Sequence, residues 1–94
     1  MSMRRVRLAL EDESVGGVLF TEDDDDSRRH WLLLADVPQR VVVDLSVGGR
    51  IELVLDHDEG ERRVVGTVDD LSVDERDGKL QVRGHHGLDP WPEG

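Results

Sequence analysis

In the stretch Ile51-Glu52-Leu53-Val54-Leu55, a large aliphatic side chain recurs at every second position. This period is typical of a β-strand that buries one face, whereas an amphipathic helix repeats its apolar face about every three or four residues. A polar segment, residues 56–61, comes next and is followed by the Val-rich stretch 63–68. The sequence therefore predicts a β-hairpin made of residues 51–55 and 63–68.

The same alternation recurs before this hairpin. Val6, Leu8 and Leu10 stand at alternate positions and predict a first strand from about residue 4 to residue 10. Two further apolar stretches, residues 18–21 and 30–35, flank a loop rich in carboxylates. We expect these two stretches to pair with each other across that loop, because its like charges cannot pair in a sheet.

Turn residues mark the remaining elements. Residues 41–45 begin a Val-rich element beyond Pro38. Asp77-Gly78 is the strongest turn dipeptide in the chain and precedes a short apolar stretch, residues 80–83. No segment repeats its apolar residues with a helical period. The sequence therefore predicts an all-β domain at residues 1–84, a single small antiparallel barrel of about six strands, followed by a flexible tail at residues 85–94.

The composition fits one small core. The chain has 94 residues, of which 36% are hydrophobic, and Trp31 stands inside an apolar run where a core position is expected. There is no cysteine, which excludes a disulfide framework, a thiolate nucleophile and cysteine-based metal sites. No stretch approaches the roughly 20 apolar residues that span a bilayer. We therefore expect a cytoplasmic protein that does not enter a membrane.

The formal net charge of −10 comes from 22 acidic and 12 basic residues. Proteins that bind duplex DNA usually gather cations over the phosphates, so this balance argues against that class of function. The acidity has three candidate origins: codon usage, adaptation to high salt, and an acidic face that binds a basic partner or imitates nucleic acid.

The order of strands and turns between residues 47 and 84 resembles that of Sm-like and SH3-like small barrels. Gly48-Gly49 precedes the first of these strands, Gly66-Thr67-Val68 ends the second, and Asp77-Gly78 precedes the last. The resemblance implies a small barrel. For the Sm family it also implies RNA binding through an Asp and an Asn in the loop before the last of these strands. Here that loop, residues 73–78, contains no Asn.

A second stretch, Asp44-Leu45-Ser46-Val47-Gly48-Gly49, resembles the D-x-S-x-x-G motif of PilZ domains. The resemblance implies a cyclic di-GMP site that includes Asp44, Ser46 and Gly49. In that family an R-x-x-x-R element supplies guanidinium groups, and the arginines of this chain that stand in its place have another spacing: Arg4, Arg5 and Arg7. The other interpretation is a structural bend in which Gly49 takes a positive φ.

No constellation in the sequence predicts catalysis, a metal or a cofactor. Asp56, Asp58 and Gly60 imitate the opening of a calcium loop, but no Glu closes it, so an exposed hairpin tip is expected. The hydroxyl residues stand in no context typical of a nucleophile. The histidines are scattered among turns and define no site: His30, His57, His85 and His86.

The sequence thus favours a non-catalytic protein-binding or regulatory module whose partner is another protein. Trp91, between Pro90 and Pro92, is the candidate partner anchor, because an exposed Trp is costly unless it packs on something. The alternative is a nucleotide-binding barrel of the PilZ kind or an RNA-binding Sm-like barrel, which requires arginines gathered on one face. A third class is an enzyme subunit or a small hydrolase, which would require a pocket that the composition does not predict.

Overall fold

The computed structural model describes residues 2–10, 13–23, 29–37, 45–57, 60–74 and 76–91, which form strands and turns and no helix. Every strand pairing among them is antiparallel, so the predicted all-β antiparallel class is confirmed. No helix in these ranges is long and apolar enough to cross a membrane. The strands are β1 (Ser2–Ala9), β2 (Ser14–Asp23), β3 (Arg29–Asp36), β4 (Arg50–His57), β5 (Gly60–Thr67), β6 (Asp70–Asp74) and β7 (Lys79–Gly84).

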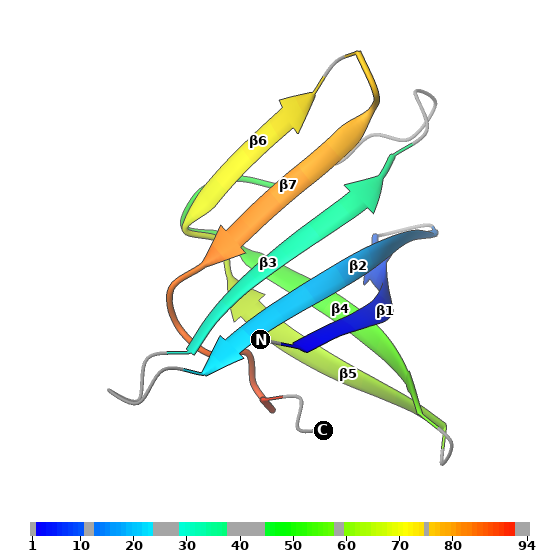
Figure 1. Ribbon diagram of the computed structural model, residues 1–94, viewed down its shortest axis with the longest axis vertical. Helices are drawn as coiled ribbons and strands as arrows, with labels where there is room; N and C mark the ends of the chain where they lie inside the picture. Colours follow the sequence, from blue (N-terminus) through cyan, green and yellow to red (C-terminus); the bar gives the residue numbers. More distant parts are fainter. Residues whose placement is uncertain are drawn as a thin grey trace.

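All seven strands belong to one sheet, in the order β5-β4-β1-β2-β3-β7-β6. The two edge strands, β5 and β6, are joined in the chain by Val68 and Asp69 alone. So short a link requires the sheet to curl until its two edges approach each other. Figure 1 shows the result, with β4 and β5 passing behind β1, β2 and β3.

The curled sheet does not close into the predicted barrel, because β5 and β6 are not paired with each other. Backbone groups at their junction bond elsewhere: the Val68 N–H donates to the Gly49 carbonyl at 2.9 Å, and the Gly48 N–H donates to the Val68 carbonyl at 2.7 Å. Val68, which lies in the link between the two edge strands, is therefore bonded to the turn before β4. The short acidic strand β6 is not among the strands that the sequence predicts.

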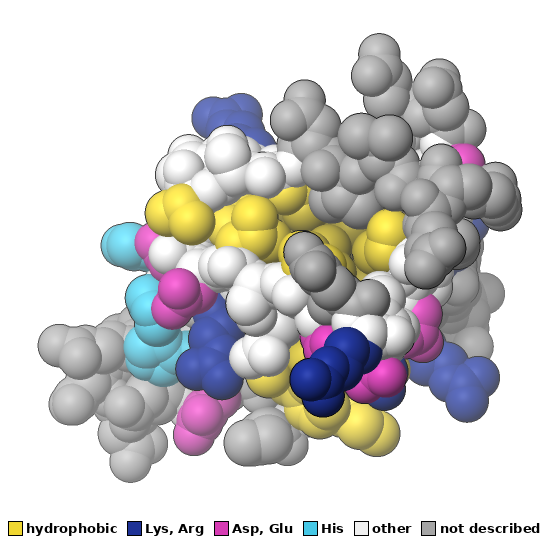
Figure 2. Space-filling view, turned by 90° about the horizontal axis from the view of Figure 1, so that it is seen from above, with side chains coloured by type: hydrophobic (Ala, Val, Ile, Leu, Met, Phe, Trp, Pro, Cys, Tyr) yellow, Lys and Arg dark blue, Asp and Glu magenta, His cyan; other side chains and the backbone are white. Residues whose placement is uncertain are grey.

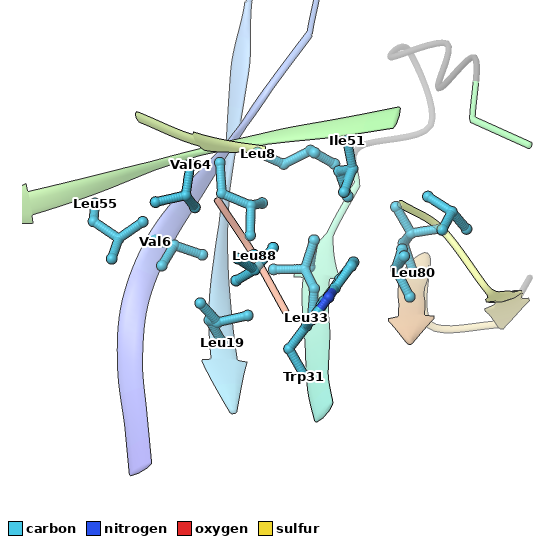
Figure 3. Packing of buried hydrophobic residues seen from close by; sticks show 14 of the residues in the cluster. Val6, Leu8, Leu19, Trp31, Leu33, Ile51, Leu55, Val64, Leu80 and Leu88 are labelled. Atoms are coloured by element: carbon cyan, nitrogen blue, oxygen red, sulfur yellow. The ribbon is translucent and has the colours of Figure 1, made fainter. Parts of the chain in front are cut away.

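The hydrophobic core lies between the two layers of the curled sheet. Side chains alternate across each strand, and the inward set is buried on both layers, as at Leu19, Leu33 and Leu53. Figure 3 shows buried side chains converging from the strands, with Leu88 among them. Burying a Leu or Val side chain contributes about 1.5–3 kcal/mol. The inward face therefore accounts for the main stabilisation, and the opposite face is available for other roles.

The predicted hairpin is confirmed, since β4 pairs with β5 and places Leu53 opposite Val64. Trp31 occupies the predicted core position with 3% of its surface exposed. Its indole N–H donates to the His86 carbonyl at 3.0 Å, which satisfies the one polar group that the ring buries. The predicted element at residues 41–45 falls outside the described residues except for Leu45, which is not in a strand.

The segment after β7 lies along the edge of the sheet. Leu88 is buried, and Asp89 forms an antiparallel bridge with Val65 of β5 through two backbone hydrogen bonds of 3.0 and 2.8 Å. Residues 85–91 belong to the stretch that the sequence predicts as a flexible tail. The bridge occupies part of the open edge of β5, a common way to protect an edge strand.

Candidate functional site

The side of the sheet that faces away from the core is apolar at its centre. We call the outward-facing side chains of β1, β2, β3, β6 and β7 the outer face. Two neighbouring cross-strand rows run across it, Met3-Phe20-Leu32-Arg83 and Arg5-Val18-Leu34-Gln81. Their apolar members form a continuous patch, here called the floor: Met3, Val18, Phe20, Leu32 and Leu34.

The floor is open to solvent in the part of the chain that the structure describes. Met3 is 69% exposed, and the other four floor side chains are half-buried. Two hollows of about 490 and 570 Å³ lie over this face and share Phe20 and Leu34 among their lining residues. Contiguous apolar surface that is rimmed by polar groups typically marks a site of interaction.

Charged side chains of both signs surround the floor. Arg7 pairs with Glu61 of β5 at 2.6 Å, and Arg83 stands opposite Asp70 in the register of β6 and β7. The cations of the outer face are Arg5, Arg7, Lys79 and Arg83. The carboxylates of the outer face are Glu22, Asp36, Asp70 and Asp74. The face as a whole is therefore close to neutral, although the chain carries a formal charge of −10.

The arginines of the PilZ resemblance do not share one face. Arg4 alternates with Val6 and Leu8 on the inward side of β1, whereas Arg5 and Arg7 point outward. Asp44, the first residue of the motif, lies outside the described residues. The arginines that the motif would need therefore lie on opposite sides of β1.

The rest of the PilZ-like motif lies in a tight turn. The Gly49 N–H donates to the Ser46 carbonyl at 2.9 Å. The positive φ falls on Gly48, at +87°, and not on Gly49 as the sequence interpretation supposed. Gly48 is the third residue of this four-residue turn, the position at which a type II turn requires positive φ. Gly49 is instead confined by space, since a Cβ there would lie 3.0 Å from the Ser46 carbonyl oxygen.

Histidines gather at one end of the outer face, which sequence spacing did not predict. The Nδ1 atoms of His30 and His85 are 3.4 Å apart, and His86 Nδ1 lies 3.6 Å from Asp69 Oδ2. Figure 2 shows the visible histidines together at one side of the molecule. The Asp69 carboxylate accepts a 2.6 Å hydrogen bond from the His85 backbone N–H, which lowers the pKa of Asp69, and the neighbouring His86 acts in the same direction.

This cluster offers at most two ligands to a metal ion. A separation of 3.4 Å suits two nitrogens on neighbouring corners of a tetrahedral ion. Among the residues that the structure describes, however, no group of three or more His, Asp or Glu side chains could hold a metal. A pair of ligands without a third binds zinc weakly, so the geometry does not define a metal centre.

Trp91, the candidate partner anchor, is half-buried against the core on the inward side. The Arg29 guanidinium carbon lies 5.4 Å from the centroid of its ring, a cation–π contact. Packing within the chain therefore accounts for much of its apolar surface.

The floor was missed at the sequence level, although the chain carries a signal for it. Val18-Leu19-Phe20 and Trp31-Leu32-Leu33-Leu34-Ala35 are unbroken apolar runs, so both faces of β2 and β3 are apolar.

Comparison of the chain with protein-family models, curated proteins and solved structures finds no match.

Proposed function

We propose that this chain is a non-catalytic protein-binding module that docks its partner on the outer face. The observation that carries the proposal is the open floor of Met3, Val18, Phe20, Leu32 and Leu34, which lies on the central strands β1, β2 and β3 of the sheet. Burying apolar surface of this kind favours association. The charged side chains that surround the floor balance in sign, so they can exclude water from the edge of the contact without requiring a strongly charged partner.

Affinity capture from cells of the native host tests the proposal. The bait is the chain itself, compared with Met3→Lys and with Val47→Lys as a matched control. Met3 and Val47 are 69% and 65% exposed, so both substitutions add the same charge at a solvent-exposed position. Only Met3 belongs to the floor.

We expect a protein that is captured by the unchanged chain and by Val47→Lys and is lost with Met3→Lys. Capture that is equal for all three baits contradicts the proposal. So does the absence of any capture by a chain that also stays monomeric at millimolar concentration. A cytoplasmic location is part of it, and microscopy of the tagged full chain in the native host tests that part.

A further inference from the structure

We infer that the partner of the outer face is a second copy of this chain, so that two molecules pack floor to floor. This inference rests on the proposed function, because it names the partner of the same face. A two-fold dimer places one patch on both sides of its interface, so the patch must complement itself. An apolar centre with a rim of both signs meets this condition.

The charge distribution favours a copy over a charged ligand. Two chains of formal charge −10 repel each other through most orientations. At physiological ionic strength a charge acts over about 8 Å, so groups in contact feel mainly their local surroundings. On the outer face the four cations and four carboxylates named above balance, so two such faces can meet without net repulsion. A nucleic acid or a strongly acidic peptide finds no excess of cations there.

The size of the face sets the expected affinity. The strands β1, β2, β3 and β7 span about 19 Å at a spacing of about 4.8 Å, and six residues along β2 span about 20 Å. The projected contact is then roughly 400 Å² for each copy, which places the dimer at or below the low end of stable interfaces. We therefore expect a dissociation constant in the micromolar range or weaker.

Sedimentation equilibrium of the purified full chain over micromolar to millimolar concentrations tests the inference. We expect a monomer–dimer equilibrium whose dissociation constant rises about tenfold or more in Met3→Lys and in Phe20→Lys. Val47→Lys should leave it unchanged. Added salt should preserve or strengthen the dimer because it screens the like net charges, whereas a complex held by opposite charges would weaken. Circular dichroism of each variant confirms that the sheet is intact.

Each other outcome overturns the inference. A chain that stays monomeric at all concentrations, while capture from host cells depends on Met3, has another protein as partner, so the proposed function survives alone. A monomer whose captures do not depend on Met3 overturns both. A dimer unaffected by Met3→Lys and Phe20→Lys forms through a different surface.

Discussion

Gly84 lies against the indole ring of Trp31, and a Cβ atom added to Gly84 would overlap the Nε1 and Cε2 atoms of that ring. Gly66 approaches the same ring, where an added Cβ would lie 3.0 Å from Cζ2. The large buried side chain is thus accommodated by two strands that present no side chain to it. The position of Trp31 in turn fixes the segment after β7, through the hydrogen bond from the indole to His86.

We expect Gly84→Ala to lower the free energy of unfolding by about 1–3 kcal/mol, the usual cost of overfilling a packed core. Chemical denaturation followed by circular dichroism measures this change. Gly16→Ala is the matched control, since a Cβ at Gly16 on the outer face meets nothing within 4 Å. The control should keep or slightly raise stability, because alanine restricts the unfolded chain. Equal effects of the two substitutions would show that Gly84 does not touch the indole ring.

Gly48 is a position where conformation, and not space, requires glycine. Its φ is +87°, and a Cβ there meets nothing within 4 Å. We expect Gly48→Ala to lower the free energy of unfolding by about 1–2 kcal/mol, the cost of a left-handed conformation for an L-residue. Gly48→Asn should lose less, because asparagine tolerates positive φ better. If alanine and asparagine behave alike, the turn has another conformation in solution.

The local fold was predictable where the inward side chains of a strand alternate clearly along the sequence. The alternation of Ile51, Leu53 and Leu55 predicted β4 correctly because each of these side chains points inward. The outer face was missed because β2 and β3 are apolar on both sides. A continuous apolar run does not indicate which side of the strand stays exposed to solvent. Barrel closure was wrong for a different reason. The edge strands β5 and β6 do not pair, and Val68 between them bonds to Gly48 and Gly49, which are distant in sequence.

The candidate site shows the same limit. His30 and His85 stand 55 positions apart and meet only because β3 pairs with β7. Their proximity follows from the sheet register, which the spacing of histidines in the sequence does not encode. The balance of charge on the outer face has the same origin, because it depends on which strands are neighbours.

The hydrogen bond from the His85 N–H lowers the pKa of Asp69. A carboxyl whose pKa is lower in the folded state stabilises the fold above its unfolded pKa of about 4, and this contribution disappears as the pH falls through the lower, folded pKa. We therefore expect Asp69→Asn to destabilise the protein near neutral pH and to make no difference at strongly acidic pH. Denaturation at a series of pH values measures this, with Asp70→Asn as the control. A difference between Asp69→Asn and the unchanged chain that grows toward acidic pH, below about 4, would contradict the assignment.

Trp31 and Trp91 are the two tryptophans of the chain, and the structure places them in different surroundings. Trp31 is 3% exposed, whereas Trp91 is half-buried beneath the Arg29 guanidinium. We expect Trp91→Phe to leave one tryptophan, Trp31, whose emission is shifted to the blue and resists quenching by acrylamide.

Because the Trp91 contact is internal and lies away from the floor, Trp91→Phe should leave dimerisation unchanged. The cation–π contact should contribute about 0.5–1 kcal/mol in a double-mutant cycle of Arg29→Ala and Trp91→Ala. Loss of association with Trp91→Phe would restore Trp91 as the partner anchor and move the docking surface from the outer face to the segment after β7.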